Sequence, residues 1–127
     1  MYKIANIDKK IYKCITDDIT TDEVIITDER IAHINARHPN DYAKIAPFLQ
    51  EALLNPDYIL KDRKRKNTGI ILKTIQLEDT RIQIVLRLQT SSDNPGLKNS
   101  IVSAWKIGKS RWDNYIRNKE ILYKKQE

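Results

Sequence analysis

Hydrophobic and polar residues alternate along the second half of the chain. Between residues 81 and 89, one side of the pattern carries Ile82, Ile84, Leu86 and Leu88, and the other side carries Arg81, Gln83, Val85, Arg87 and Gln89. This alternation predicts an antiparallel sheet with one buried face and one face in water. Strands are expected at Tyr58–Leu60 and over about 69–77, 81–90 and 99–106, joined by turn-rich loops.

In the first half, apolar residues recur every three or four positions, which is the spacing of a helix. Thr27 is a suitable N-cap for a helix over residues 28–37, and Pro39 predicts where that helix ends. A second helix is expected over about residues 40–53. Pro47 lies inside it and predicts either a kink or a restart at a new first turn.

The ends of the chain complete the predicted fold. A last helix is expected over about 111–120, while 2–7 and 10–16 suggest a hairpin or an edge strand. The order of elements predicts an α+β fold, with N-terminal helices packed on a roughly four-stranded antiparallel sheet and a C-terminal helix. With 127 residues and few glycines or prolines, the chain is expected to form one domain over 1–127.

Composition narrows the cellular setting. The chain has one cysteine, Cys14, so it cannot form an internal disulfide or a cysteine-based zinc site. Its first residues do not resemble a signal peptide, and no stretch approaches the roughly 20 apolar residues of a membrane span. We therefore expect a cytoplasmic protein without a membrane partner.

Charge points to a polyanionic partner. The formal net charge is +6 and the isoelectric point is about 9.4. Bases crowd residues 61–66 and recur from 106 to 125, whereas 17–29 contains acids and no base. Each run alone is best explained as a solvated surface, but two basic runs together favour contact with a phosphate backbone.

Both histidines lie in one short segment next to arginines. Arg30, His33 and Arg37 fall on one face of the predicted helix, and His38 follows at its end. Cleavage of RNA without a metal requires proton transfer by groups such as imidazole and a cation that stabilises charge on the phosphate. The alternative is that both are ordinary surface histidines. The spacing supplies too few ligands for a metal, and no cofactor is expected.

Further candidates come from the predicted sheet. Lys73 lies mid-strand among apolar residues, so it either reaches solvent at an edge or meets a phosphate. Ser103 alternates with apolar residues, and it could hydrogen-bond a phosphate or be an ordinary strand serine. Tyr123, among lysines, could stack on a base or donate a proton. The predicted substrate-binding residues are Arg30, Arg37, Arg87, Thr90, Lys64 and Arg65.

Several motifs, in this order, resemble those of the barnase–EndoU–colicin–RelE-like nucleases of phages and mobile elements. They are Ile25 to Ile34 with Arg37-His38-Pro39, Asn55 to Ile59, Lys73, Asn99 to Ala104, and Leu122-Tyr123. The resemblance covers about residues 24–123, leaving 1–20 outside the matching pattern. It implies a metal-independent endoribonuclease that leaves a 2′,3′-cyclic phosphate. It also implies His33, His38, Lys73, Ser103 and Tyr123 as candidate catalytic residues.

The resemblance carries expectations about partners. RNA, such as tRNA or mRNA, would be the substrate, and a toxin-like ribonuclease suggests an inhibitor protein. Two alternatives remain: a non-catalytic nucleic-acid-binding module on the same fold, and an interaction protein whose acidic segment 17–29 docks a basic partner. The nuclease hypothesis further predicts that His33, Lys73 and Ser103 converge around one phosphate on the solvent side of the sheet.

Overall fold

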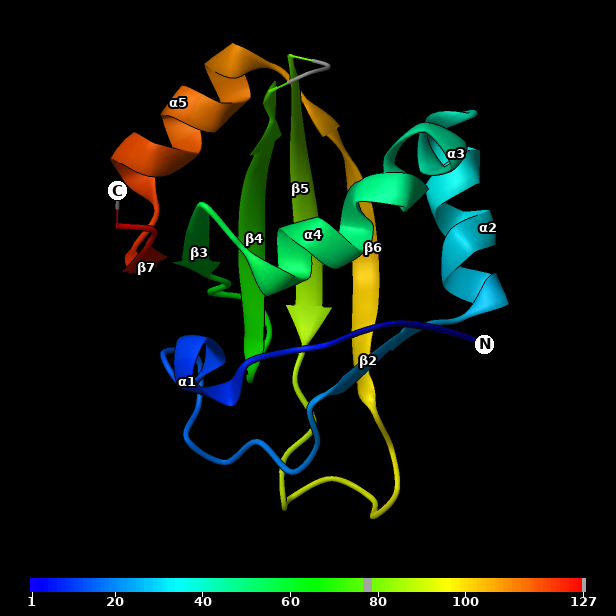
Figure 1. The fold of residues 1–127 in the computed structure, drawn as a ribbon, viewed down its shortest axis with the longest axis vertical. Helices are drawn as coiled ribbons and strands as arrows, with labels where there is room; N and C mark the ends of the chain where they lie inside the picture. Colours follow the sequence, from blue (N-terminus) through cyan, green and yellow to red (C-terminus); the bar gives the residue numbers. More distant parts are fainter. Residues whose placement is uncertain (77–78, 127) are drawn as a thin grey trace.

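A single mixed sheet organises the protein (Figure 1). The computed structural model describes residues 1–76 and 79–126, and within these the strand order is β1-β2-β6-β5-β4-β3-β7. The strands are β1 Tyr2–Asn6, β2 Glu23–Ile26, β3 Tyr58–Lys61, β4 Thr68–Ile75, β5 Thr80–Arg87, β6 Asn99–Ile107 and β7 Ile121–Lys124. The helices are α1 Lys9–Tyr12, α2 Asp28–Arg37, α3 Asp41–Ile45, α4 Leu49–Leu54 and α5 Lys109–Asn118, with a 3-10 turn at Ala46–Phe48.

The α+β class is as predicted, but the four-stranded antiparallel sheet is wrong. Seven strands pair among the described residues, and β2 runs parallel to β6 while the other pairs are antiparallel. The additional strands β1, β2 and β7 have only four or five residues each. Such short segments show little periodicity, and their pairing depends on partners far away in the sequence.

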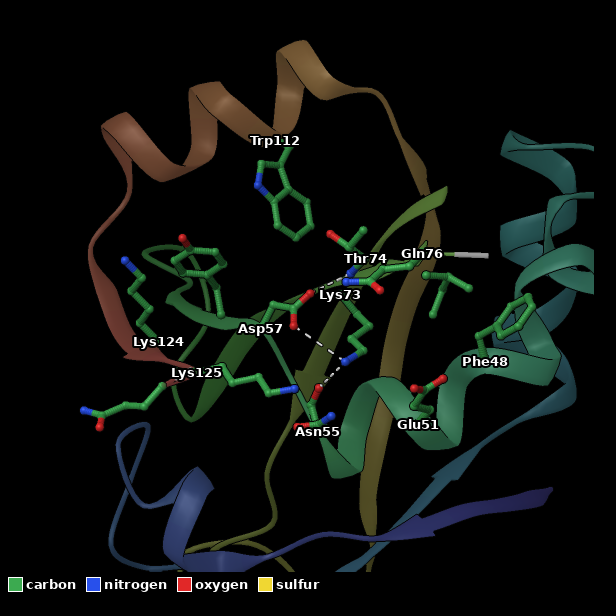
Figure 2. A pocket seen from close by; sticks show the side chains of 13 residues that line it. Phe48, Glu51, Asn55, Asp57, Lys73, Thr74, Gln76, Trp112, Lys124 and Lys125 are labelled. Carbon is green, nitrogen blue, oxygen red and sulfur yellow. Dashed lines mark hydrogen bonds and ion pairs between the residues drawn. The ribbon is translucent and has the colours of Figure 1, made fainter. Parts of the chain in front are cut away.

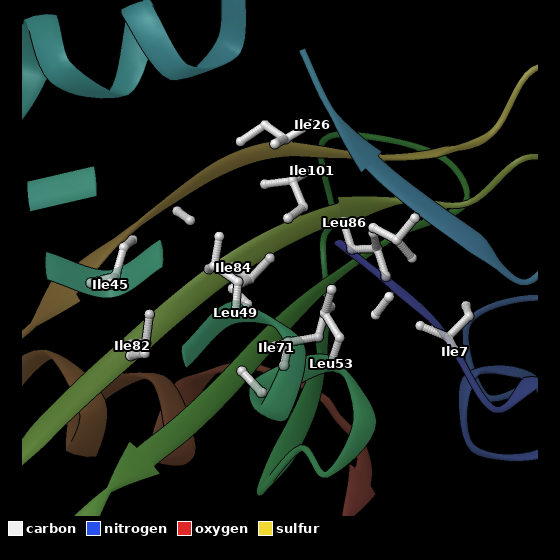
Figure 3. Packing of buried hydrophobic residues seen from close by; sticks show 14 of the residues in the cluster. Ile7, Ile26, Ile45, Leu49, Leu53, Ile71, Ile82, Ile84, Leu86 and Ile101 are labelled. Atoms are coloured by element: carbon white, nitrogen blue, oxygen red, sulfur yellow. The ribbon is translucent and has the colours of Figure 1, made fainter. Parts of the chain in front are cut away.

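One face of the sheet packs against α4, and we call it the α4 face (Figure 3). Alternation places Ile71, Ile82 and Ile84 on this side, where Leu49 and Leu53 of α4 join them in the main core. All five are fully buried. The predicted apolar side of β5 is therefore confirmed as the side that carries the core.

The opposite face of the sheet, which we call the α5 face, was predicted to be exposed to water, and this prediction is wrong. Trp112, Tyr115 and Ile116 of α5 pack over a second cluster of buried residues, Leu60, Ile70, Leu72 and Ile107. Gln83 and Val85, expected to be solvated, are only 4% and 5% exposed. The alternation pattern did not predict that α5 covers this face, because several residues on that side of β5 are polar. The buried Gln83 Oε1 has no hydrogen-bond partner in the described part of the chain, which is energetically costly.

The N-cap and the limits predicted for the helix over 28–37 are confirmed by α2. The Thr27 hydroxyl accepts a hydrogen bond from the backbone N–H of Arg30 at 3.2 Å and caps the helix. Pro47 lies in the 3-10 turn that separates α3 from α4, which agrees with a break at that position. The predicted hairpin or edge strand is half right, because β1 forms but residues 10–16 contain the end of α1 and a turn in place of a strand. The end predicted for the strand over 69–77 lies outside the described residues.

Asn99 ties the parallel strand pair to the rest of the sheet. Its Oδ1 accepts a hydrogen bond from the backbone N–H of Gln89 at 2.7 Å, and its Nδ2 donates to the carbonyl of Thr21 at 2.8 Å. The residue is fully buried, so water cannot replace either bond. The Asn99 carboxamide therefore links the start of β6 to the segments before β2 and after β5, in addition to the backbone pairing of β2 with β6.

We predict that Asn99→Ala lowers the free energy of unfolding by about 2–4 kcal/mol, because it leaves a buried N–H and a carbonyl without partners. Urea denaturation measures this loss. The matched control is Asn114→Ala on the exposed side of α5, which should change stability by no more than about 0.5 kcal/mol. Equal losses in the two variants would contradict the role given to Asn99.

Candidate nucleic-acid interface

Lys73 extends from β4 on the α4 face and is almost fully buried. Its Nζ donates a hydrogen bond to the carbonyl of Asn55 at 2.8 Å and lies 3.5 Å from Oδ1 of Asp57. The other Asp57 oxygen accepts a hydrogen bond from the backbone N–H of Thr74 at 2.7 Å. Lys73 thus joins the end of α4, the start of β3 and the edge of β4.

A groove of about 1180 Å³ opens beside this ion pair (Figure 2). Lys73, Asp57 and Thr74 form its floor, and Trp112 of α5 extends into it from one side. The remaining lining includes Phe48 and Glu51 on the α4 side and Lys124, Lys125 and Gln126 at the end of the chain. Both cationic and aromatic groups therefore border one hollow surface.

Ser103 lies on the other side of the sheet from Lys73. Strand register pairs Lys73 with Ile82, whose side chain belongs to the core of the α4 face, whereas Ser103 pairs with Val85 on the α5 face. Side chains of adjacent residues in a strand point to opposite faces. The structure therefore does not bring His33, Lys73 and Ser103 together around one phosphate.

His38 is the histidine that contacts the sheet. Its ring stacks on Trp105 of β6, with 5.2 Å between ring centroids and 16° between planes. Trp105 pairs with Gln83, so it lies on the same face as Ser103, two residues earlier in the strand. Neither the His38 ring nitrogens nor the Ser103 hydroxyl has a hydrogen-bond partner within residues 1–76 and 79–126.

His33 and its arginine neighbours stay on the exterior of α2. Arg30, His33 and Arg37 are all exposed, while Ile34 between them is buried in the main core. The predicted helical stripe therefore forms. Arg37 directly precedes His38, so this stripe ends at the residue that stacks on the sheet.

Arg87 and Thr90 hold the loop after β5. The Arg87 guanidinium donates to Oδ1 of Asp93 at 2.8 Å, and the backbone N–H of Thr90 donates to Oδ2 at 2.9 Å. The Thr90 N–H, its hydroxyl and the Arg87 charge together hold the pKa of Asp93 below its usual range. These two predicted substrate-binding residues therefore already have intramolecular partners.

The remaining predicted residues are dispersed. Lys64 and Arg65 lie in an exposed loop ordered by Asp62, which forms a 3.1 Å ion pair with Arg65. Tyr123 of β7 pairs with Ile59 and packs against the main core, at the far edge of the sheet from β6. Sequence reasoning missed Trp105 as the partner of His38. The only available signal was an aromatic residue two positions after Ser103 in the same strand.

These features define the class of protein as a small α+β domain with one mixed sheet and basic residues near two of its edges. A family model described as phage-Barnase-EndoU-ColicinE5/D-RelE like nuclease2 matches residues 3–124. The chain therefore belongs to this phage-associated nuclease family, and the match includes most of the N-terminal residues 1–20 that the recognised motifs left out. No curated protein and no solved structure matches the chain.

Two searches of the described residues concern metals and membranes. Residues 1–76 and 79–126 contain no cluster of three or more His, Cys, Asp or Glu side chains that could hold a metal ion. In that same part of the chain, none of the helices has the length and apolar character needed to cross a bilayer.

We predict that Lys73→Met lowers the free energy of unfolding by about 1–3 kcal/mol, because the Asn55 carbonyl and the Asp57 carboxylate lose their donor. Denaturant titration measures the effect. The matched control is Lys106→Met, an exposed lysine of β6, which should shift stability by about 0.5 kcal/mol at most. A Lys73→Met protein with unchanged stability and lost RNA cleavage would instead assign Lys73 to a phosphate.

Proposed function

We propose that this protein is a metal-independent endoribonuclease in which His38 transfers a proton during cleavage. Three facts support the proposal: membership of the nuclease family, a net charge of +6, and an imidazole fixed at the edge of β6 with unpartnered nitrogens in the described structure. The single observation that carries it is the stacking of His38 on Trp105. Stacking holds the ring in place without using either nitrogen.

The reaction needs two proton transfers. The ribose 2′-oxygen attacks phosphorus as a base removes its proton, the bond from phosphorus to the 5′-oxygen breaks, and the leaving oxygen gains a proton. The products are a 2′,3′-cyclic phosphate and a free 5′-hydroxyl. His38 performs one transfer, and His33, the exposed histidine of α2, is proposed for the second.

Phosphate charge also requires stabilisation. Arg37 is exposed and directly precedes His38, so its guanidinium is the nearest cation along the chain to the stacked ring. Ser103, on the same face as Trp105, offers a hydroxyl to a non-bridging oxygen. Cationic and hydroxyl donors aimed at a phosphate lower the energy of the charged transition state. Arg30 continues the basic stripe along α2.

We predict that His38→Phe abolishes cleavage while preserving the fold. Phenylalanine keeps an aromatic ring against Trp105 but has no nitrogen to carry a proton, so the rate should fall by about 100-fold or more. The measurement is cleavage of RNA in EDTA, with analysis of fragment ends for cyclic phosphate. Denaturant titration of the same variant checks that folding is unchanged, and His33→Ala is measured in parallel.

Each outcome decides between specific alternatives. Equal cleavage by wild type and His38→Phe would refute the role of His38, and cleavage that needs a divalent cation would refute metal independence. RNA that binds but stays intact would favour the non-catalytic nucleic-acid-binding module. Undiminished cleavage by His33→Ala would refute the role of His33, and another residue would then have to perform the second proton transfer.

Cellular control follows from the proposed activity. A ribonuclease in the cytoplasm damages the RNA of its host, so we propose a toxin-like protein that acts on a restricted RNA or is held by an inhibitor protein. Host growth under induced expression tests this idea. Wild type should slow growth and His38→Phe should not, whereas equal growth would contradict toxicity.

A further inference from the structure

The groove beside Lys73 lies well away from the stacked histidine. Register places Trp105, Gln83, Leu72 and Tyr58 in one row across β6, β5, β4 and β3. Three strand spacings of roughly 4.8 Å separate Trp105 from Tyr58, or about 14 Å. Tyr58 lines the groove, so the groove is a separate place for a ligand.

Its floor is already neutralised. Lys73 and Asp57 pair with each other, and the Asn55 carbonyl and Thr74 N–H are satisfied by the same two side chains. A ligand therefore meets a closed hydrogen-bonded floor and no unpaired buried charge. Recognition must come from the walls and the mouth of the groove.

An aromatic wall is the first recognition element. Trp112 is half-buried and extends from α5 into the groove, where its ring meets Tyr58 edge-on, with centroids 5.9 Å apart and planes at 80° (Figure 2). One side of Trp112 packs on the buried cluster beneath α5, and the part of the indole that lines the groove is left for other partners. The indole N–H donates to no acceptor in the described chain. A planar ring can stack on such a surface.

Cations at the mouth are the second element. Lys124 is exposed and Lys125 half-buried, and neither has a carboxylate partner in the part of the chain that the structure describes. The backbone N–H of Lys125 donates to the carbonyl of Asp57 at 2.9 Å, which fixes this segment against the groove. Glu51 lies on the opposite, α4 side, so an anionic group is favoured at the lysine side only.

We infer that this groove binds an unpaired nucleotide, with its base against Trp112 and its phosphate between Lys124 and Lys125. Lys124 pairs with Tyr58, and the side chain of Lys125 extends toward Asn55 (Figure 2). Adjacent aromatic and cationic side chains are the usual composition of sites for single-stranded nucleic acid. The groove volume of about 1180 Å³ is larger than the roughly 300–1,000 Å³ of pockets that enclose drug-sized ligands. The groove is therefore large enough for a nucleotide. The inference does not depend on the proton-transfer role of His38.

Intrinsic fluorescence provides a direct test. The chain has two tryptophans, so Trp105→Phe leaves Trp112 as the sole reporter, and adenosine 5′-monophosphate serves as the probe. We predict saturable quenching of Trp112. Adenosine and inorganic phosphate should each bind at least about tenfold more weakly, a difference of about 1.4 kcal/mol, because each lacks one of the two recognition elements.

Matched charge variants locate the phosphate. In the Trp105→Phe background, Lys124→Gln with Lys125→Gln should raise the dissociation constant about tenfold. The control, Lys3→Gln with Lys44→Gln, removes the same charge from exposed lysines of β1 and α3 and should raise it by no more than about twofold. Denaturant titration confirms that both double variants fold.

Three results would overturn the inference: no saturable quenching, equal binding of inorganic phosphate, or equal weakening by both double variants. Failure here is distinct from failure of the proposed catalytic role. The double variant Trp105→Phe/His38→Phe should still show quenching of Trp112 by the nucleotide, although cleavage is lost. Conversely, cleavage that requires His38 can occur without a nucleotide in this groove.

Discussion

The apolar contact between α5 and the sheet is the interaction that most constrains this molecule. Leu72 and Ile107 are buried beneath Trp112, Tyr115 and Ile116, while the reverse face of the same strands carries the main core. Central residues of β4 and β5 are therefore dry on both sides. Reactive polar groups have to lie at the edges of the sheet, because a buried charge without a partner is strongly unfavourable.

Strand lengths create those edges. β2 pairs with only the first residues of β6, so the later part of β6 borders α2 (Figure 1). His38 stacks on Trp105 in that part of the strand. β3 pairs with β4 only as far as Leu72, and Lys73 comes directly after that point. The stacked histidine and the groove are thus two consequences of strands that end early. Their separation explains why Lys73 and Ser103 do not meet.

The sequence was most informative where the signal is local. The Thr27 cap, the limits of α2 and the apolar side of β5 follow from neighbouring residues, and they were predicted. The parallel pairing of β2 with β6 and the covering of Gln83 by a helix depend on contacts between distant segments, so they could not be derived. The candidate residues were found by type, but strand parity decides their faces. The strand register places Lys73 and Ser103 on opposite faces of the sheet, and no sequence motif indicates this.

The turn that follows α2 has an entropic consequence. Pro39 restricts its own backbone, Asn40 adopts a left-handed conformation with φ of 66°, and the N–H of Asp41 donates to the carbonyl of His38 at 3.0 Å. The turn fixes the backbone of His38 and stacking on Trp105 fixes its ring, so the imidazole is oriented when the chain folds, before any ligand arrives. A group immobilised in advance loses little freedom on association, so more of the interaction energy remains for affinity and for lowering the barrier.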